Sequence, residues 1–197
     1  MSDKSVNFFA HETVVIDEPC TIGDGTKIWH FSHILTGSRI GENCQLGQSV
    51  MVGIDVVIGS NCKIQNNVSI HKGVTLEDGV FCGPSCVFTN VLTPRAEVDR
   101  SGELLKTYVE TGATIGANAT VTCGIKIGKY ALIGAGAVVT KDVKPYAVMV
   151  GNPVKFRRFA CKCGELLPSR NWIAVTCERC RAEYKSIDGQ VVPMSGD

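Results

Sequence analysis

Apolar residues recur at every sixth position along most of the chain. A small or β-branched residue follows each of them four positions later. The pattern runs from Ile16 to Phe88 and resumes from Val109 to Val139, shifted by three positions. An α-helix repeats every 3.6 residues and a strand every two, so neither gives a strict period of six. A solenoid with three six-residue faces per coil gives this period. The pattern therefore predicts an all-β chain folded as a left-handed parallel β-helix of about six coils.

Residues eighteen positions apart stack in such a solenoid and form three corner columns. Two columns are made of ordinary turn residues, among them the Gly, Asn and Asp that tight turns favour. The third column is rich in hydrogen-bonding groups. It contains His30, Gln48, Asn66 and Pro84, preceded by Trp29, Gly47, Gln65 and Gly83 and followed by Phe31, Ser49, Asn67 and Ser85. Two interpretations stay open: a solvated edge or Asn/Gln ladder between coils, and a polar groove for a ligand.

The repeat is interrupted at residues 89–108, which carry fifteen residues more than the hexads require. We predict an extruded loop there. Long loops in compact solenoids are often functional, although a tolerated insertion is the alternative. If the loop leaves at the second corner, Ala117–Asn118 and Ala135–Gly136 continue the third column. Their exposed backbone amides would then suit an extended amide-bearing chain such as pantetheine.

The length of 197 residues allows one domain and a small appendage, which we place at residues 1–153 and 154–197. The formal net charge of +1 gives no electrostatic reason to expect nucleic acid or a membrane surface as partner. The first residues lack the basic-then-apolar pattern of a signal peptide, and no apolar run approaches the ~18 residues of a spanning helix. We therefore expect a soluble, cytoplasmic protein.

The ten cysteines fall into two groups, and six of them lie between residues 20 and 123. Cys20, Cys44, Cys62 and Cys86 take the small position of the repeat, and Cys82 takes an aliphatic position. Free cysteine packs as a small apolar residue. These five are therefore expected to be buried packing residues rather than redox or catalytic groups.

The other four cysteines, Cys161, Cys163, Cys177 and Cys180, resemble the two knuckles of a small zinc ribbon. The first pair departs from the usual Cys-x-x-Cys, because only one residue separates its thiols. Because this segment is too short to bury a useful core, a structural zinc would supply its folding energy. Four thiolates leave no open position for catalysis. The alternative is four reduced thiols in a loosely docked tail.

Several longer strings within the hexads resemble a known family. They are KIWHFSH at 27–33, KIQNNV at 63–68, FCGPSCVFTN at 81–90, GATIGAN at 112–118, IGAGAVV at 133–139 and VGNP at 150–153. In these strings the chain resembles the hexapeptide-repeat acyltransferases, specifically the branch that acetylates the 3-amino group of nucleotide-linked 3-amino sugars. The segment from Gly83 to Asn90 is the most specific of them.

The resemblance implies a homotrimer with active sites between neighbouring subunits and acetyl-CoA as the acetyl donor. The acceptor that it implies is UDP-2-acetamido-3-amino-2,3-dideoxyglucuronate, for surface polysaccharide biosynthesis, with a dTDP-3-amino-3,6-dideoxyhexose as the alternative. The chain departs from the family pattern at His71, where Tyr is usual, and at Thr93, where Asn usually precedes Pro-Arg. These departures concern the identity of the sugar more than the reaction.

The resemblance also implies that Asn90 holds the acceptor amine. A sugar amine is substantially neutral near neutral pH, so catalysis would be mostly positioning and oxyanion stabilisation. A histidine base, with His71 as candidate, is the alternative. The predicted substrate-binding residues are His30, Gln48, Gln65, Asn66, Asn67, His71, Ser85, Arg95 and Arg100. The predicted cofactor-binding residues are Ala117, Asn118, Ala135, Gly136, Lys141, Lys155 and Arg157, with Arg158 as a further candidate for the CoA phosphates. Both basic sets can equally be solvated.

Two other classes of protein compete with this hypothesis. A non-catalytic β-helix scaffold with a zinc ribbon would also account for the repeat, but the polar third column and the long loop argue against it. A γ-type carbonic anhydrase needs three histidines on facing corners. His30 and His33 are too close in sequence for that arrangement, and no third partner stands out.

Overall fold

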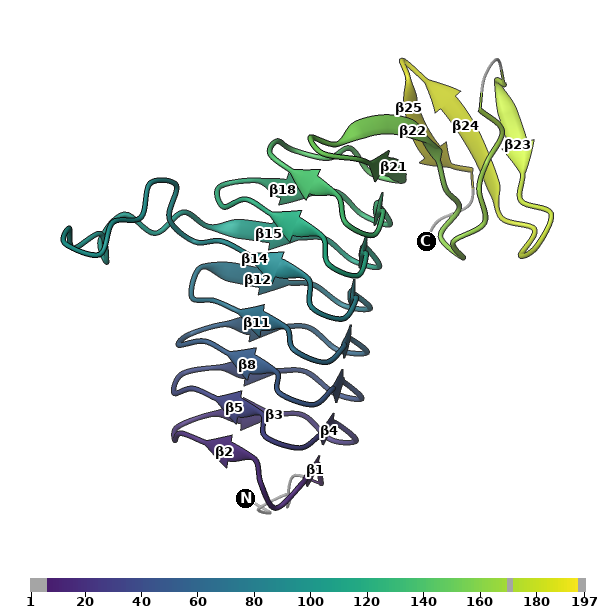
Figure 1. Cartoon of the computed structure of the whole chain (residues 1–197). Helices are drawn as coiled ribbons and strands as arrows, with labels where there is room; N and C mark the ends of the chain where they lie inside the picture. The colour runs from purple at the N-terminus through teal and green to yellow at the C-terminus, as the bar shows by residue number, and fades with distance from the viewer. Residues whose placement is uncertain (1–6, 170–171, 195–197) are drawn as a thin grey trace.

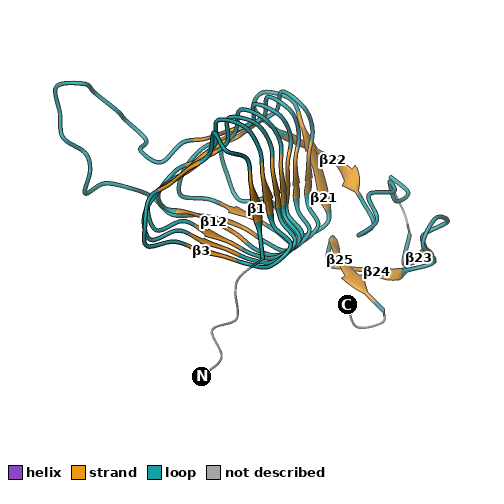
Figure 2. Cartoon of the chain, turned by 90° about the horizontal axis from the view of Figure 1, so that it is seen from below, coloured by secondary structure: helices purple, strands orange, loops and turns teal. Residues whose placement is uncertain are grey.

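The computed structural model describes residues 7–169 and 172–194, and this part of the chain contains strands but no helix. None of the described segments is therefore a long apolar helix that could cross a membrane. The strands lie on three faces of a prism that is triangular in cross-section (Figure 2). The chain is a left-handed parallel β-helix, as the hexads predict.

Each face is one sheet, and consecutive strands alternate among the three sheets. Sheet A contains β1 (Phe9–Ala10), β4 (Lys27–Ile28), β7 (Gln45–Leu46), β10 (Lys63–Ile64), β13 (Phe81–Cys82), β16 (Thr114–Ile115), β19 (Leu132–Ile133), β21 (Ala147–Val150) and β22 (Lys155–Phe159). Sheet B contains β2 (Val15–Ile16), β5 (His33–Ile34), β8 (Met51–Val52), β11 (Ser69–Ile70), β14 (Val87–Phe88), β17 (Thr120–Val121) and β20 (Val138–Val139). Sheet C contains β3 (Thr21–Ile22), β6 (Arg39–Ile40), β9 (Val57–Ile58), β12 (Val74–Leu76), β15 (Thr107–Val109) and β18 (Lys126–Ile127).

The solenoid is longer than the hexad count indicates. Sheet A has nine strands, and only β22 among them runs antiparallel to its neighbour, so eight parallel strands are stacked (Figure 1). The predicted six coils miss the two ends: β1 precedes the first hexad, and β21 follows the last one. Both ends continue the sheet without the six-residue spacing that the pattern detects.

The solenoid interior is filled by the second residue of each strand. Ile28, Ile34 and Leu46 are fully buried there and stack on residues of the neighbouring coils. The small position of the repeat has a second role besides packing. The Thr26 hydroxyl donates a hydrogen bond to the Gly41 carbonyl at 2.8 Å, and the Cys44 thiol donates to the Gly59 carbonyl at 3.1 Å. Polar residues are therefore tolerated inside because they bond to carbonyls of the next coil.

The solenoid cysteines largely match the expectation of buried packing residues. Cys44, Cys62, Cys82 and Cys86 are buried, and Cys20 is half-buried near the start of the stack. A hydrogen bond with Cys86, together with burial, raises the pKa of the Cys82 thiol well above its usual range. Such a thiol stays protonated and unreactive.

The third corner column runs the length of the solenoid in the predicted register. Its turn residues share a left-handed backbone conformation; they are Phe31, Ser49, Asn67, Ser85, Asn118 and Gly136. Beyond the loop, the Asn118 amide donates to the Pro84 carbonyl at 3.0 Å and the Gly136 amide to the Ala117 carbonyl at 2.8 Å. The loop therefore leaves at the second corner, and the column continues past it as predicted.

The predicted loop projects from the solenoid between β14 and β15 (Figures 1 and 2). It includes residues 89–106, because Thr107 already belongs to β15, where the prediction extended it to 108. Its return is fixed at the base, where the Leu105 amide donates to the Asn90 carbonyl at 3.0 Å and the Thr107 amide to the Gly73 carbonyl at 2.9 Å.

The tail packs on the last corners of the solenoid. β22 pairs with β21, and the chain then forms a three-stranded antiparallel sheet of β23 (Ala174–Thr176), β24 (Glu183–Ile187) and β25 (Gln190–Pro193). The tail has a small buried cluster of its own, which consists of Tyr146, Cys161, Leu167, Cys177, Tyr184 and Val191. Tyr146 belongs to the solenoid, so the tail is not loosely docked. The boundary at residue 153 stays a prediction.

Candidate functional site

The third corner presents a line of polar residues along one edge of sheet B. Gln48, Asn66 and Asn67 are exposed, whereas His30 and Ser85 are half-buried. The Asn66 side-chain oxygen accepts the Gln48 amide at 2.9 Å, so this residue does form a ladder between coils. Among the described residues, the side chains of Gln48 and Asn67 have no hydrogen-bond partner. They are available to a ligand.

The second corner, at the other edge of sheet B, carries the candidate catalytic groups. Ser69 pairs with Val87, so His71 lies one coil before Thr89, the neighbour of Asn90. Both His71 and Asn90 are half-buried at the base of the loop. The Asn90 backbone is fixed by its bond from Leu105, while its side-chain amide makes no hydrogen bond within the described part of the chain. That amide is positioned at the loop base and is available to a substrate.

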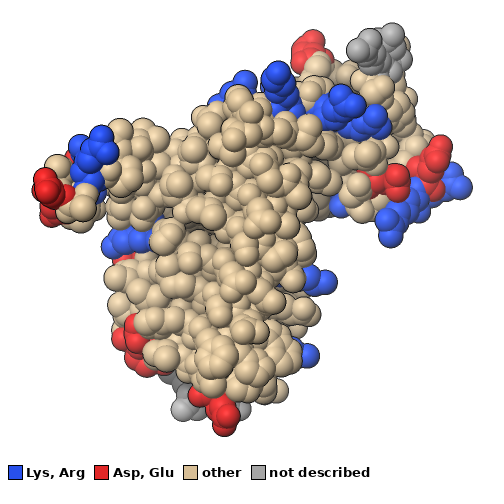
Figure 3. Space-filling view, in the orientation of Figure 1, with Lys and Arg blue, Asp and Glu red and all other residues tan. Residues whose placement is uncertain are grey.

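One chain alone does not bring these two lines of residues together, because the strands of sheet B separate them. The outward-facing first residues of these strands include no Lys, Arg, Asp or Glu; they are Val15, His33, Met51, Ser69, Val87, Thr120 and Val138. Sheet A presents Lys27 and Lys63 on its outer row, and sheet C presents Arg39 and Lys126. The space-filling view shows few charged atoms over the sheet B strands (Figure 3). The outer row of sheet B between the two candidate half-sites therefore holds no Lys, Arg, Asp or Glu, and the Asp17 carboxylate reaches it only beside His33, at 2.8 Å from Nε2.

The two loop arginines differ in their environment. Arg95 is exposed. The Arg100 guanidinium forms a close ion pair with Glu103, with 2.7 Å between Nη1 and Oε2. Arg100 is thus engaged within the loop and would have to leave Glu103 to contact a phosphate or a sugar carboxylate.

The predicted cofactor-binding residues divide between the third corner and the C-terminal end. Asn118, Ala135 and Gly136 are exposed on the corner, and Ala117 is half-buried. Lys141, Lys155 and Arg157 are exposed near β22, and Arg158 is half-buried. A cavity of about 480 Å³ at this end is lined by Lys141, Val143, Ala147, Met149, Phe156 and Phe159, among others. A mostly apolar cavity with lysines at its margin is a suitable environment for part of an anionic cofactor.

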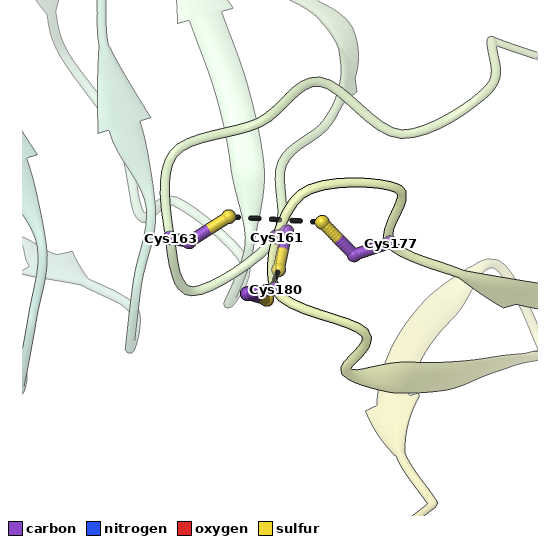
Figure 4. A group of neighbouring side chains, drawn as sticks. All are labelled: Cys161, Cys163, Cys177 and Cys180. Atoms are coloured by element: carbon purple, nitrogen blue, oxygen red, sulfur yellow. Dashed lines mark hydrogen bonds between the residues drawn. The ribbon is translucent and has the colours of Figure 1, made fainter.

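The four tail cysteines converge on one point. Their sulfur atoms all lie within 4.8 Å of one another. Figure 4 shows the side chains pointing together from two turns, one after β22 and one between β23 and β24. The Sγ atoms of Cys161 and Cys180 are 3.3 Å apart, and those of Cys163 and Cys177 are 3.6 Å apart. Tetrahedral zinc with bonds of about 2.3 Å places sulfur atoms roughly 3.8 Å apart, so these residues could hold such an ion.

Sequence reasoning missed Tyr184 beside the tail cysteines, and it placed Trp29 and Phe31 in the third column without giving them a role. The Tyr184 hydroxyl is buried 3.1 Å from the Cys161 sulfur and accepts the Lys162 amide at 3.1 Å. Its position, four residues after the last cysteine, is the only signal in the sequence that could have suggested this contact. At the third corner, Trp29 and Phe31 flank His30 with exposed rings, although the spacing of the hexads alone would suit any turn residue there.

Comparison with known proteins agrees with this geometry. The family model described as bacterial transferase hexapeptide (six repeats) matches residues 19–53 and 106–141, and a hexapeptide repeat of succinyl-transferase matches residues 38–72. The dTDP-3-amino-3,6-dideoxy-α-D-galactopyranose 3-N-acetyltransferase of Aneurinibacillus thermoaerophilus is 46% identical over 191 residues, which cover 97% of each chain.

Two solved structures share the fold. The acetyltransferase domain of PglB from Neisseria gonorrhoeae, in complex with acetyl coenzyme A, has a TM-score of 0.51 at 16% identity and covers 77% of this chain and 58% of that one. AntD, an N-acyltransferase from Bacillus cereus in complex with dTDP and coenzyme A, has a TM-score of 0.51 at 15% identity, with coverages of 78% and 83%. The chain belongs to the hexapeptide-repeat N-acetyltransferases of nucleotide-linked amino sugars, which use acetyl-CoA as donor.

Proposed function

We propose that this enzyme acetylates the 3-amino group of a dTDP-linked 3-amino-3,6-dideoxyhexose for surface polysaccharide biosynthesis. The observation that carries the proposal is the 46% identity, over 97% of both chains, to an enzyme named for that class of substrate. The UDP-linked 2-acetamido-3-amino-2,3-dideoxyglucuronate expected from the sequence is the second candidate. Arg95, the exposed loop arginine, favours it, because a guanidinium would pair with the sugar carboxylate.

A panel of dTDP- and UDP-linked 3-amino sugars, each incubated with the enzyme and acetyl-CoA, distinguishes the two acceptors. Mass spectrometry is expected to detect rapid acetylation of a dTDP-linked sugar. Preferential turnover of the UDP-linked uronate would replace the first candidate by the second. No acetylation of any amino sugar would reject both.

In the proposed mechanism the Asn90 amide orients the acceptor amine. Its carbonyl oxygen accepts an amine hydrogen, so that the nitrogen lone pair faces the thioester carbonyl. The nitrogen–carbon bond forms, the carbon–sulfur bond breaks, and CoA leaves as its thiol after taking up the proton that the amine releases. A neutral amide cannot serve as the base, and the half-buried position of Asn90 at the loop base suits orientation.

Replacing Asn90 by Ala tests this role against that of His71. The loss of one such contact is expected to lower kcat by about 10²–10³, roughly 2.7–4 kcal/mol, whereas His71→Ala should lose much less. Steady-state kinetics between about pH 6 and 9 compare the variants. A near-normal Asn90→Ala together with a collapsed His71→Ala that has lost an ionisation near the ~6.5 of free histidine would favour a histidine base.

We further propose a homotrimer in which neighbouring subunits share each site. The support is the outer row of sheet B, which holds no Lys, Arg, Asp or Glu and lies between two lines of candidate site residues. Packing of this face would bring the third corner of one subunit beside the second corner of the next. Light scattering at micromolar concentration is expected to give three chains per particle, and a monomer with full activity would contradict the shared site.

We also propose one structural zinc ion per chain, held by Cys161, Cys163, Cys177 and Cys180. The sulfur positions support it, since all lie within 4.8 Å of one another. The ion would connect the two turns that carry the cysteine pairs and would take no part in acetyl transfer. Elemental analysis of purified protein should find zinc at one equivalent.

Reduced thiols and acetyl-CoA both point to the cytoplasm as the site of action.

A further inference from the structure

Phe31 combines backbone strain with exposure. Its φ is +58°, in the left-handed region that favours Gly and Asn, and its side chain is 63% exposed. The other residues at this position of the third corner are Ser, Asn or Gly. A bulky L-residue in this conformation costs free energy, and such strain persists only where the surroundings impose it.

The first coil imposes this conformation through a short chain of contacts. The Thr13 hydroxyl accepts the Phe31 amide at 2.9 Å and lies 3.0 Å from Nδ1 of His11. The His11 ring stacks on His30 with 3.6 Å between ring centroids. In the following coils a backbone carbonyl receives the corresponding amide, as where Ser49 donates to His30 at 2.9 Å. The strained corner is therefore built by specific side chains.

A series of ring contacts leads from Phe31 through His30 and Trp29 to Phe9. Trp29 is 42% exposed and lies within 8° of parallel to the His30 ring, and Phe9 is 46% exposed with its centroid 5.5 Å from that of Trp29. Phe9, Trp29 and Phe31 each leave a large part of the ring exposed. Together they form an open aromatic surface, which we call the aromatic corner: Phe9, His11, Trp29, His30 and Phe31.

We infer that the aromatic corner stacks against the nucleobase of the sugar nucleotide; this inference rests on the proposed function. Aromatic side chains bind flat bases through their faces, without need of a charge. The corner begins the polar third column, so Gln48 and Asn67 would follow the base along the same edge. Phe31 and Ser85 are three coils apart, which corresponds to about 14 Å at the spacing of neighbouring strands. This separation is comparable with the length of an extended nucleotide sugar.

The test uses Phe31→Asn in the complete enzyme, because Asn67 and Asn118 already adopt this conformation in the same column. The loss of the ring should raise the Kd for dTDP or UDP alone, measured by calorimetry, by about fivefold to a hundredfold. KM for the sugar nucleotide should rise in parallel, with kcat and KM for acetyl-CoA little changed. Phe31→Tyr should restore binding. Ile173→Asn, which removes an exposed apolar side chain of the tail, away from both corners, is the control and should bind as the wild type does.

Three outcomes decide between the alternatives. Unchanged binding of both nucleotides by Phe31→Asn would overturn the inference. Loss of binding together with dissociation into monomers would also overturn it, because the corner would then belong to the subunit interface. If the wild type acetylates no amino-sugar nucleotide, the proposed function fails, whereas the nucleotide titrations still report on the corner independently.

Discussion

Aromatic residues occupy left-handed corners at both ends of the solenoid, but only one end covers them. At the C-terminal end, Tyr130 and Tyr146 have φ values of +54° and +60°. Tyr146 is 3% exposed and packs edge-on against Tyr184 of the tail, with 5.5 Å between centroids. At the N-terminal end, Phe31 has the same backbone conformation and remains mostly exposed.

The difference concerns what offsets the cost of the left-handed conformation at each end. Burial of the ring does so at the C-terminal end but not at the N-terminal end. A left-handed conformation costs a bulky residue roughly 1–2 kcal/mol. At the C-terminal end, burial of Tyr146 between the solenoid and the tail offsets that cost. At the N-terminal end the hydrogen bond from the Phe31 amide to Thr13 holds the backbone, but the described chain does not bury the ring, and we assign that role to a ligand. The tail of the same chain thus buries the aromatic ring at the C-terminal corner.

The largest effect is expected from unfolding the tail that packs on Tyr146. Cys177→Ser should lose zinc and unfold the β23–β25 sheet, because small zinc peptides derive roughly 10–16 kcal/mol of apparent folding free energy from the metal. Hydrogen exchange should increase across residues 172–194, while the amide of Phe31 keeps its protection. Cys20→Ser, outside the cluster, should retain zinc. Unchanged protection of the tail in the zinc-free variant would show that its apolar cluster folds alone.

A smaller effect is expected from Tyr146→Asn, which removes a ring from the covered end. The lost packing resembles a large-to-small core substitution of about 3–5 kcal/mol, reduced by roughly 1–2 kcal/mol of relieved strain. The free energy of unfolding should therefore fall by about 1–4 kcal/mol in denaturant titration. A variant as stable as the wild type would mean that Tyr146 contributes nothing to the docking of the tail.

The sequence predicted the solenoid well because its geometry depends on local spacing. The six-residue period from Ile16 to Val139 fixes the three sheets, and the shift of register after Phe88 correctly located the loop and the continued third column. The period could not predict β1 or β21, because neither belongs to a complete hexad. It also could not reveal why Thr26 and Cys44 suit the interior, since the carbonyls that they bond to lie fifteen residues away.

The candidate site was less predictable, because its parts come from separate edges of the fold. Cysteine spacing was sufficient to bring Cys161 and Cys180 together, whereas nothing in the sequence indicates that Arg100 pairs with Glu103 rather than facing a ligand. The two lines of candidate residues meet only if another subunit completes the site, and the periodicity of one chain holds no information on that packing. Strain at Phe31 is likewise invisible until the backbone is known.

The smallest effect is expected for Phe31→Asn, whose free energy of unfolding should hardly change. This variant gives the most direct comparison between the exposed and the buried aromatic corner. The chemical change is similar to that in Tyr146→Asn, at nearly the same φ, but the ring removed is exposed. Little packing is lost, apart from a loose contact with His30 at 6.1 Å between centroids, and the strain is relieved. The free energy of unfolding of the ligand-free protein should therefore stay unchanged or rise by up to about 1 kcal/mol. Denaturant titrations of the two variants side by side should give shifts of different sign or size. If Phe31→Asn is as destabilised as Tyr146→Asn, the N-terminal ring packs within the assembly, and a nucleobase is not needed to account for it.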